Sequence, residues 1–196
     1  MITSVYFIRH ARPDISIKDE TRPLSLEGLK KSEELVKIFS EIKIDNIYSS
    51  PYKRAVQTIE PIANNKNIKI KIVKDFHEIK VSKDYWIGDN FNEFCKKQWN
   101  DFSYKLTGGE SLFEVQKRNV KELNRILFKR KGMTIIIGTH GIALSTIINY
   151  YDKTFKYNNF ENIADIMPYI IKIEFKDDKY IRRNEILNIE DSPNCT

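Results

Sequence analysis

Apolar residues follow two different spacings along this chain. Short runs rich in Ile, Val, Phe and Tyr with polar residues at both ends are typical of strands. Such runs cover residues 5–8, 44–48, 68–73, 134–138, 167–175 and 179–187. In other segments apolar residues recur every three or four positions, which predicts helices. These segments are residues 26–39, 51–63, 91–104, 111–131 and 142–148.

Serines mark three of the expected helix starts. Ser25 is placed to cap the first helix, and Ser111 with Glu114 fits a capping box. Residues 49–51 read Ser-Ser-Pro, which predicts a helix with a serine N-cap and a proline in its first turn. We expect Pro61 to kink that helix or to weaken its second half.

The order of the elements indicates the fold class. Strands alternate with helices, which predicts an α/β fold, a three-layer α/β/α sandwich with a mainly parallel central sheet. With 41% hydrophobic residues and no internal repeat or linker, residues 1–196 are expected to form a single domain. The Ile/Lys alternation of residues 68–73 is typical of a half-exposed edge strand. The last two strands offer another edge for pairing, and the sequence leaves the oligomeric state open.

Charge and cysteine content narrow the class of protein. The net charge is +6, with lysines spread over the whole length, which indicates a solvated surface or an attraction for small anions. No dense basic helix is present, so nucleic-acid binding is not expected. Cys95 and Cys195 have neither disulfide nor metal-ligand spacing, and no signal-peptide or membrane-spanning pattern occurs. We therefore expect a cytoplasmic protein without a membrane partner.

Two of the three histidines directly follow predicted strands. His10 follows the first strand and Arg9, and His140 follows the strand at residues 134–138. In open α/β sheets, ligands bind outside the carboxyl ends of the strands. If these strands are parallel neighbours, both imidazoles project into one cleft. A helix begins after His140, and its N-terminal N–H groups favour an anion.

An arginine and a glutamate elsewhere in the chain complete a possible site. Arg54 lies near the start of a predicted helix, where Arg9 and Arg54 could reach the same anion with their planar guanidinium groups. Glu78 follows a strand, and partly apolar neighbours suit a general acid. Three nearby acids remain alternatives, namely Asp75, Asp84 and Asp89.

These residue types are the parts that phosphoryl transfer needs. Neutral His10 would attack phosphorus and form a phosphohistidine, while cationic side chains stabilise the phosphoryl oxygens. The neighbouring arginines and His140 would favour the unprotonated form of His10. The sequence contains no cluster with metal-ligand spacing, so we expect side-chain cations in place of a metal.

Taken together, the motifs resemble those of the histidine phosphatase superfamily, also called the phosphoglycerate mutase-like family. In chain order they are Arg9-His10, Ser49-Ser50-Pro51 with Arg54-Ala55 and Thr58, Glu78-Ile79, Gly109-Glu110-Ser111 with Arg118, and Thr139-His140-Gly141. They fall in the family's order and cover most of the chain. The ordered set is far more specific than any one motif.

The resemblance implies a role for each site residue. His10 would be the phosphorylated nucleophile, with Glu78 and His140 as the other catalytic residues. Glu78 would protonate the leaving oxygen and then activate the water that hydrolyses the phosphohistidine. The residues implied to bind the substrate are Arg9, Arg54 and Gly141. The resemblance also implies the three-layer fold, a small phosphorylated substrate, and neither a metal nor an organic cofactor.

Departures from the family pattern concern the pocket and the reaction type. Ala11 follows the nucleophile where many members have Gly, which would matter if this position required a positive φ. Residues 80–90 match the usual Gly-Trp-Glu-Gly segment poorly, and we expect His77 at the pocket rim or surface. The short interval at residues 55–75 favours a phosphatase over a cofactor-dependent phosphoglycerate mutase, which usually carries an insertion there. A non-catalytic phospho-ligand-binding module is a third interpretation.

Overall fold

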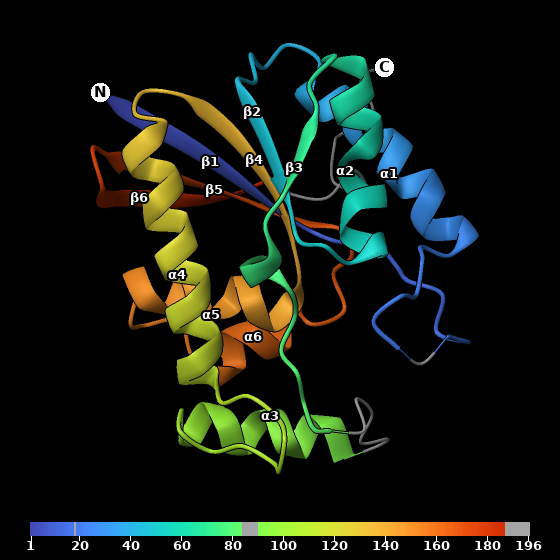
Figure 1. Ribbon diagram of the computed structural model, residues 1–196, viewed down its shortest axis with the longest axis vertical. Helices are drawn as coiled ribbons and strands as arrows, with labels where there is room; N and C mark the ends of the chain where they lie inside the picture. Colours follow the sequence, from blue (N-terminus) through green and yellow to red (C-terminus); the bar gives the residue numbers. More distant parts are fainter. Residues whose placement is uncertain (18, 84–89, 187–196) are drawn as a thin grey trace.

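The strands form one mixed sheet with a parallel core. The computed structural model describes residues 1–17, 19–83 and 90–186. Within these residues, a six-stranded sheet has the order β3-β2-β4-β1-β5-β6 (Figure 1). The strands are β1 (Ile2–Arg9), β2 (Asn46–Ser49), β3 (Ile70–Ile72), β4 (Thr134–Thr139), β5 (Tyr169–Lys176) and β6 (Lys179–Ile186). The first four in sheet order pair in parallel, β5 pairs antiparallel with β1, and β6 pairs antiparallel with β5, so the sheet is mainly parallel.

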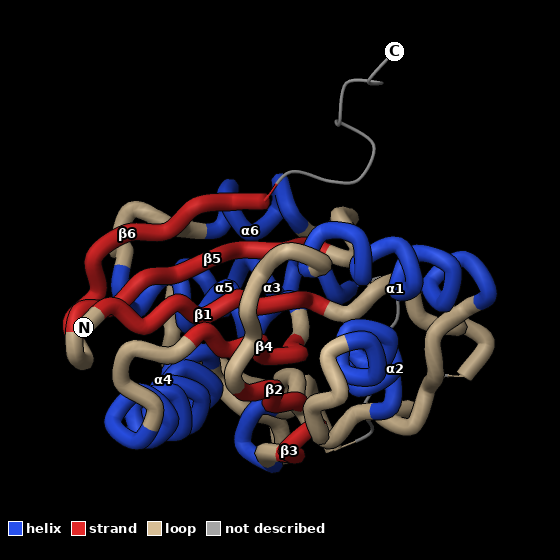
Figure 2. Tube along the Cα trace, turned by 90° about the horizontal axis from the view of Figure 1, so that it is seen from above, coloured by secondary structure: helices blue, strands red, loops and turns tan. Residues whose placement is uncertain are grey.

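Helices cover both faces of this sheet (Figure 2). They are α1 (Leu26–Phe39), α2 (Lys53–Asn65), α3 (Phe91–Asn100), α4 (Leu112–Lys129), α5 (Gly141–Tyr151) and α6 (Tyr157–Ile163), with a short 3-10 helix η1 (Lys74–Phe76). Helices α1 and α2 pack together on one face, and α4 and α5 pack together on the other. The predicted three-layer α/β/α sandwich is confirmed.

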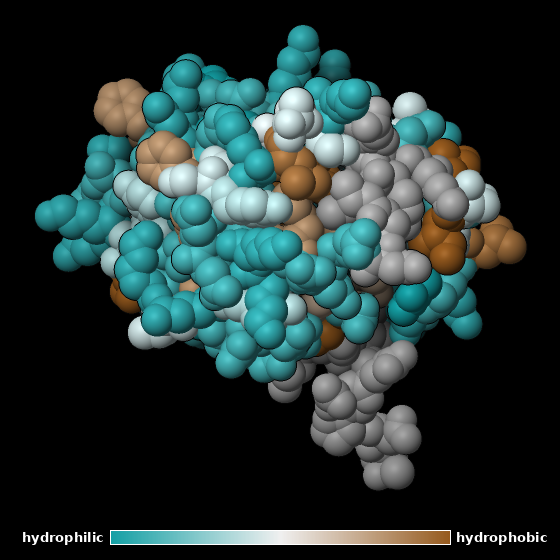
Figure 3. Space-filling model, turned by 90° about the horizontal axis from the view of Figure 1, so that it is seen from below, coloured by the Kyte–Doolittle hydropathy of each residue, from teal (hydrophilic) through white to brown (hydrophobic). Residues whose placement is uncertain are grey.

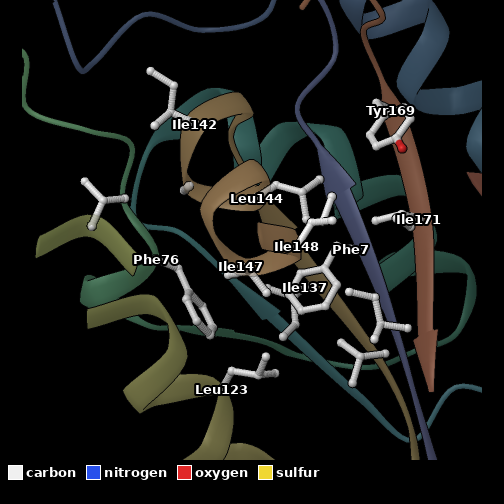
Figure 4. Close-up of a cluster of buried hydrophobic side chains, with 14 of the residues drawn as sticks. Phe7, Phe76, Leu123, Ile137, Ile142, Leu144, Ile147, Ile148, Tyr169 and Ile171 are labelled. Carbon is white, nitrogen blue, oxygen red and sulfur yellow. The ribbon is translucent and has the colours of Figure 1, made fainter. Parts of the chain in front are cut away.

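Side-chain alternation along β1 supplies a core on each side of the sheet. Val5 and Phe7 belong to the larger core under α4 and α5, while Tyr6 and Ile8 belong to the smaller core under α1 and α2. Figure 4 shows Phe7 among the side chains of α5 in the larger core. Burying one such side chain stabilises the fold by about 1.5–3 kcal/mol. The strand that ends in the candidate site is therefore anchored from both faces.

Two predicted helix caps are present. The Ser25 hydroxyl accepts a hydrogen bond from the N–H of Gly28 at 3.1 Å, at the start of α1. At the start of α4, the Ser111 hydroxyl accepts from the N–H of Glu114 at 3.2 Å, and the Glu114 carboxylate accepts from the N–H of Ser111 at 2.8 Å. The capping box predicted from the sequence is confirmed.

The predicted helix start at residues 49–51 is wrong. The N–H of Ser50 donates to the carbonyl oxygen of Gly138 at 2.9 Å, so pairing with β4 continues beyond the end of β2. Helix α2 begins after Tyr52, which provides no side-chain cap. The helix then continues through Pro61 to its end. The Ser-Ser-Pro segment thus connects a strand to a helix instead of capping one.

Other boundaries differ from the predictions by a few residues. Strand β2 begins two residues later than predicted, β3 is only three residues long at the sheet edge, and α3 ends at Asn100. Strand β5 begins after Pro168, which has no N–H to donate to a ladder. The short elements α6 and η1 were not predicted, because seven and three residues are too few to show a periodicity. Residue 187, in the last predicted strand, lies outside the described residues.

The surface is mainly hydrophilic, as the lysines spread along the sequence predict. Figure 3 shows a mostly hydrophilic face with small hydrophobic patches. Among the described residues, no helix has both the length and the apolar character needed to cross a membrane.

Candidate active site

Strands β1 and β4 bring the two strand-end histidines together. Arg9 pairs in register with Thr139, and the N–H of His10 donates to the carbonyl oxygen of Thr139 at 3.0 Å. The ring centroids of His10 and His140 are 5.3 Å apart. The two imidazoles therefore lie side by side at the carboxyl ends of two neighbouring parallel strands, as the sequence predicted, although His140 does not line the pocket described below.

The surroundings of His10 define its protonation state. Its Nδ1 lies 2.8 Å from the carbonyl oxygen of Ala11, which can only accept, so we assign the proton to Nδ1 and the lone pair to Nε2. Burial, together with the charges of Arg54 and Arg9, holds the pKa of His10 well below its ordinary value of 6.5. His10 is therefore a neutral imidazole whose Nε2 carries a free lone pair, as a nucleophile requires.

Thr58 joins the backbone after His10 to helix α2. Its hydroxyl accepts from the N–H of Ala11 at 2.9 Å and donates to the carbonyl oxygen of Arg54 at 2.7 Å. Among the described residues, Asn67 and Asp177 are the only non-glycine residues with positive φ. Ala11 therefore has an ordinary backbone conformation, and its departure from the family's glycine causes no strain.

The Arg9 guanidinium is buried beside the loop that follows α6. Its Nη1 donates to the carbonyl oxygens of Ile163 at 2.7 Å and Ile166 at 3.4 Å. Its Nε is buried and has no hydrogen-bond partner among the described residues. Burial lowers the pKa of Arg9 to about 10, although the negative charges of Glu78 and Asp165 oppose this change. Arg9 therefore remains a cation at neutral pH.

Gly141 leaves room for this guanidinium. It is the first residue of α5, and a Cβ atom at this position would lie 3.3 Å from Nε, Cζ and Nη2 of Arg9. A larger residue would push the guanidinium away from its place. If Gly141 contributes to substrate binding, as predicted, it does so by leaving space for the Arg9 guanidinium.

Arg54 reaches the same site from the start of α2. Its side chain is buried, its Nη1 donates to the carbonyl oxygen of Glu20 at 3.3 Å, and its Cζ lies 4.7 Å from the centroid of the Tyr52 ring. The Tyr52 ring in turn lies 5.1 Å from the ring of His140. Glu20, in the connection between β1 and α1, therefore helps to hold Arg54.

His140 is fully buried at the N-cap of α5. Its Nε2 lies 2.6 Å from the hydroxyl oxygen of Ser50, while its Nδ1 has no partner among the described residues. Burial and the charges of Arg54 and His10 hold the pKa of His140 well below 6.5. The Ser50 hydroxyl already accepts from the N–H of Tyr52 at 3.3 Å, so we assign its proton to the bond with Nε2. The ring proton of neutral His140 then lies on Nδ1, which is free to donate.

Glu78 lies against the N-terminus of α5. Its Oε1 accepts from the N–H groups of Ile79 at 2.9 Å and Ala143 at 3.0 Å, and its Oε2 accepts from the N–H of Ile142 at 3.1 Å. The first N–H groups of a helix have no partner within the helix, and the helix dipole favours a negative charge there. The sequence predicted partly apolar neighbours for Glu78, and a helix distant in sequence adds two backbone donors that the sequence did not predict.

A pocket of about 410 Å³ joins the predicted residues. Four of the six predicted site residues line it, namely Arg9, His10, Arg54 and Glu78. Three further charged residues that the sequence reasoning missed also line it, namely Arg12, Arg22 and Asp165. Ile15, Val81, Phe91 and Met167 belong to its apolar wall. Arg12 could have been found from its position two residues after His10, whereas Asp165 belongs to no recognisable motif.

The other acidic candidates do not join this pocket among the described residues. Asp75 lies in η1 and is not a lining residue. Asp84 and Asp89 lie outside the described residues. His77 lines a neighbouring groove, with its ring centroid 6.2 Å from that of Tyr52. Of the four acidic residues that the sequence offered, Glu78 is therefore the described one that lines the pocket with His10.

The site holds two buried nitrogen atoms that could donate to an anion, although only one of the two residues, Arg9, lines the pocket. Arg9 Nε and His140 Nδ1 are both buried and lack partners among the described residues. An unpaired buried donor costs about 1–3 kcal/mol, which the oxygen atoms of a bound anion would recover. Within the described residues, no group of three His, Cys, Asp or Glu side chains is placed to hold a metal ion. The site therefore combines a neutral imidazole, two buried guanidinium groups and a carboxyl group.

Comparison with known proteins connects this site to one family. The sequence profile of the histidine phosphatase superfamily (branch 1) matches residues 5–183. Phosphoserine phosphatase 1 of Hydrogenobacter thermophilus is 29% identical over 129 residues, which are 62% of this chain and 60% of that protein. The match thus spans about three fifths of that relative's length. The 2,3-bisphosphoglycerate-dependent phosphoglycerate mutase of Thermoplasma acidophilum is 28% identical over 157 residues, 74% of each chain.

Solved structures agree on the fold. The mycobacterial glucosyl-3-phosphoglycerate phosphatase superposes with a TM-score of 0.75 and 13% identity, over 94% of this chain and 97% of that one. At this identity the likeness concerns the fold alone.

Proposed function

This chain belongs to the histidine phosphatase superfamily, and we propose that it hydrolyses a small phosphomonoester through a phosphohistidine on His10. One observation carries the proposal: His10 is neutral and offers Nε2 in the same pocket as the guanidinium groups of Arg9 and Arg54. A nucleophile without charge and cations for the phosphoryl oxygens are the main requirements of this reaction.

In the first step, Nε2 of His10 attacks phosphorus. The N–P bond forms as the bond between phosphorus and the ester oxygen breaks, and Arg9, Arg54 and His140 Nδ1 stabilise the phosphoryl oxygens. Glu78 donates a proton to the leaving oxygen, so that the alcohol departs neutral. The proton on Nδ1 of His10 stays in its hydrogen bond to the Ala11 carbonyl.

In the second step, water attacks the phosphorus of the phosphohistidine. The Glu78 carboxylate takes a proton from the water, the N–P bond breaks, and neutral His10 is restored as phosphate leaves. Among the described residues, Oε1 of Glu78 accepts two hydrogen bonds and Oε2 accepts one. A carboxyl oxygen has two lone pairs, so Oε2 is the atom that we assign to the proton transfers.

The pocket supports a small substrate with a second anionic group. Arg12 and Arg22 line the pocket in addition to the two arginines assigned to the phosphoryl group. The Arg12 side chain also pairs with Glu27, at 3.2 Å. The names of the two sequence relatives refer to phosphoserine and phosphoglycerate, which both carry a carboxylate. We propose a phosphomonoester whose carboxylate lies near these two arginines.

Phosphoglycerate mutase activity is the second candidate, because one sequence relative is a mutase. In this chain, α2, β3 and η1 occupy most of the interval between Arg54 and Glu78. That interval leaves little room for an inserted segment that would close the site between the two half-reactions of a mutase. The short connection therefore favours hydrolysis.

A cytoplasmic location is part of the same proposal, since Cys95 is a free thiol.

The test compares the wild type with His10→Ala, using p-nitrophenyl phosphate in the presence of EDTA. We expect turnover by the wild type and a loss of roughly 1,000-fold or more in His10→Ala. Turnover that survives in His10→Ala would refute the mechanism, and an inactive wild type across many phosphoesters would favour a binding module. Isomerisation of 3-phosphoglycerate with 2,3-bisphosphoglycerate, at a rate above phosphate release, would establish the mutase instead.

A further inference from the structure

The segment that carries Glu78 has no regular secondary structure of its own. It follows η1, and residues 77–82 belong to neither helix nor strand. The Glu78 carboxyl group is nevertheless fixed by three backbone N–H groups. A side chain used for proton transfer also needs a fixed backbone, because an error of about 1 Å in position can reduce a rate about 100-fold.

Arg118 on α4 binds the carbonyl groups of this segment. Its Nη1 donates to the carbonyl oxygens of Asp75 at 2.7 Å and His77 at 2.8 Å. Its Nη2 donates to the carbonyl oxygen of Glu78 itself at 3.3 Å. One guanidinium therefore holds the backbone at and immediately before the proposed acid.

Glu110 holds both Arg118 and the backbone after Glu78. Its carboxylate accepts from Nε of Arg118 at 2.8 Å and from Nη2 at 3.0 Å. It also accepts from the N–H of Lys80 at 2.9 Å, and its own N–H donates to the Lys80 carbonyl at 2.7 Å. Burial raises the pKa of Glu110, but the hydrogen bonds and charge of Arg118 outweigh it and hold this pKa below the ordinary value.

The sequence around Glu110 is suited to this contact. A Cβ atom on Gly109 would lie 2.2 Å from the carbonyl oxygen of Val81, so only glycine allows the two segments to approach this closely. Ser111 begins α4 through its capping box with Glu114, which fixes the helix start. Arg118 follows two helical turns later, on the side of the helix that meets the segment. The Gly-Glu-Ser motif and Arg118 thus form one hydrogen-bonded unit that contacts the segment carrying Glu78.

We propose that Arg118 and Glu110 are positioning residues that hold the proton-transfer group Glu78 in place beside His10. This inference rests on the proposed role of Glu78 in the phosphatase reaction. It assigns a function to a motif that is not among the described residues lining the pocket. The ion pair is mostly buried, with 14% of the Arg118 and 20% of the Glu110 side chain exposed, so solvent competes weakly with it.

The variant Arg118→Lys tests the proposal without removing the charge. Lysine carries a point charge and lacks the planar fork that binds three carbonyl groups and a carboxylate at once. We expect kcat/KM for an alkyl phosphomonoester to fall about 10- to 100-fold, because its leaving group needs a proton. For p-nitrophenyl phosphate, whose leaving group needs little protonation, we expect a fall of less than about threefold. The ratio kcat/KM is the quantity to compare, since it excludes the later hydrolysis of the phosphoenzyme.

A matched control lies on the same helix. Arg125 pairs with Glu122 at 2.7 Å, and no hydrogen bond recorded for it reaches the segment that carries Glu78. Arg125→Lys should leave kcat/KM unchanged for both substrates. An equal loss for both substrates in Arg118→Lys would indicate general damage and would overturn the proposal. If Arg118→Lys does not fold, Glu110→Gln provides the same comparison.

The double variant Glu78→Gln with Arg118→Lys separates this inference from the proposed function. If Arg118 acts through Glu78, adding Arg118→Lys to Glu78→Gln should change kcat/KM for the alkyl substrate by less than about twofold. Independent losses that multiply would overturn the positioning role. If Glu78→Gln alone affects both substrates equally, the proposed role of Glu78 fails first, and the inference that rests on it fails as well.

Discussion

Thr58 offers the sharpest structural test of how the nucleophile is held. Its side chain is fully buried, and its hydroxyl connects the N–H of Ala11 to the carbonyl group of Arg54. Thr58→Val keeps the shape of the side chain and removes the hydroxyl. The Arg54 carbonyl remains within the hydrogen-bonding pattern of α2, whereas the Ala11 N–H loses the acceptor that the structure gives it.

The expected loss follows from that one N–H group. A buried donor left without a partner costs about 1–3 kcal/mol, so the free energy of unfolding should fall by about 2 kcal/mol. For a chain of this length, that loss corresponds to a drop in Tm of about 4–8 °C. Because Ala11 adjoins His10, kcat/KM for p-nitrophenyl phosphate should also fall by about tenfold.

Thr146→Val is the matched control. Thr146 is also fully buried, but its hydroxyl donates to the carbonyl oxygen of Ala143 at 2.9 Å, and no recorded backbone N–H depends on it. Its loss should cost no more than about 1 kcal/mol and leave kcat/KM unchanged. Urea unfolding and steady-state kinetics on both variants give the comparison. Equal losses of stability in the two variants, or an unaltered kcat/KM in Thr58→Val, would refute the reasoning.

Three further predictions concern pH, space and charge. The folded pKa values of His10 and His140 are lowered, so these side chains take up protons below about pH 6.5 only when the protein unfolds. Their full contribution to the free energy of unfolding should therefore be present above pH 6.5. Below that pH the free energy of unfolding should fall by up to about 1.4 kcal/mol per histidine per pH unit. Urea unfolding from pH 7 to 5 should show a shallower slope for His10→Gln, and an identical slope would contradict this. Gly141→Ala should raise KM for p-nitrophenyl phosphate several-fold by displacing Arg9, whereas an unchanged KM would rule out that role. Arg22→Gln should reduce kcat/KM more for 3-phosphoglycerate than for glycerol 3-phosphate, and equal losses would argue against a carboxylate contact.

The strand-end pattern predicted half of the site correctly for a simple physical reason. A buried strand that runs directly into a charged or titratable residue places that residue at the carboxyl end of the strand. Strands β1 and β4 are parallel neighbours, so their carboxyl ends lie together. The failure at residues 49–51, by contrast, has a tertiary cause. The backbone of Ser50 still pairs with Gly138, which outweighs the preference of Ser-Ser-Pro for a helix start.

The surroundings of Glu78 could not be predicted from neighbouring residues. Two of the three N–H donors to its carboxyl group come from α5, 64 and 65 residues along the chain, and the guanidinium that holds its carbonyl comes from a residue 40 positions away. Local sequence therefore favoured an apolar setting where the fold supplies a helix N-terminus. Asp165 was missed for the same reason, since only the tertiary structure places it in the pocket.

The covalent intermediate provides the most direct test of the proposed reaction. The wild-type protein is mixed rapidly with a ³²P-labelled phosphomonoester, denatured without acid, and mapped for the labelled residue. The mechanism predicts label on His10 that is stable in base and lost in acid, and no label in His10→Ala. Label on a serine or aspartate, or label that persists in His10→Ala, would contradict it.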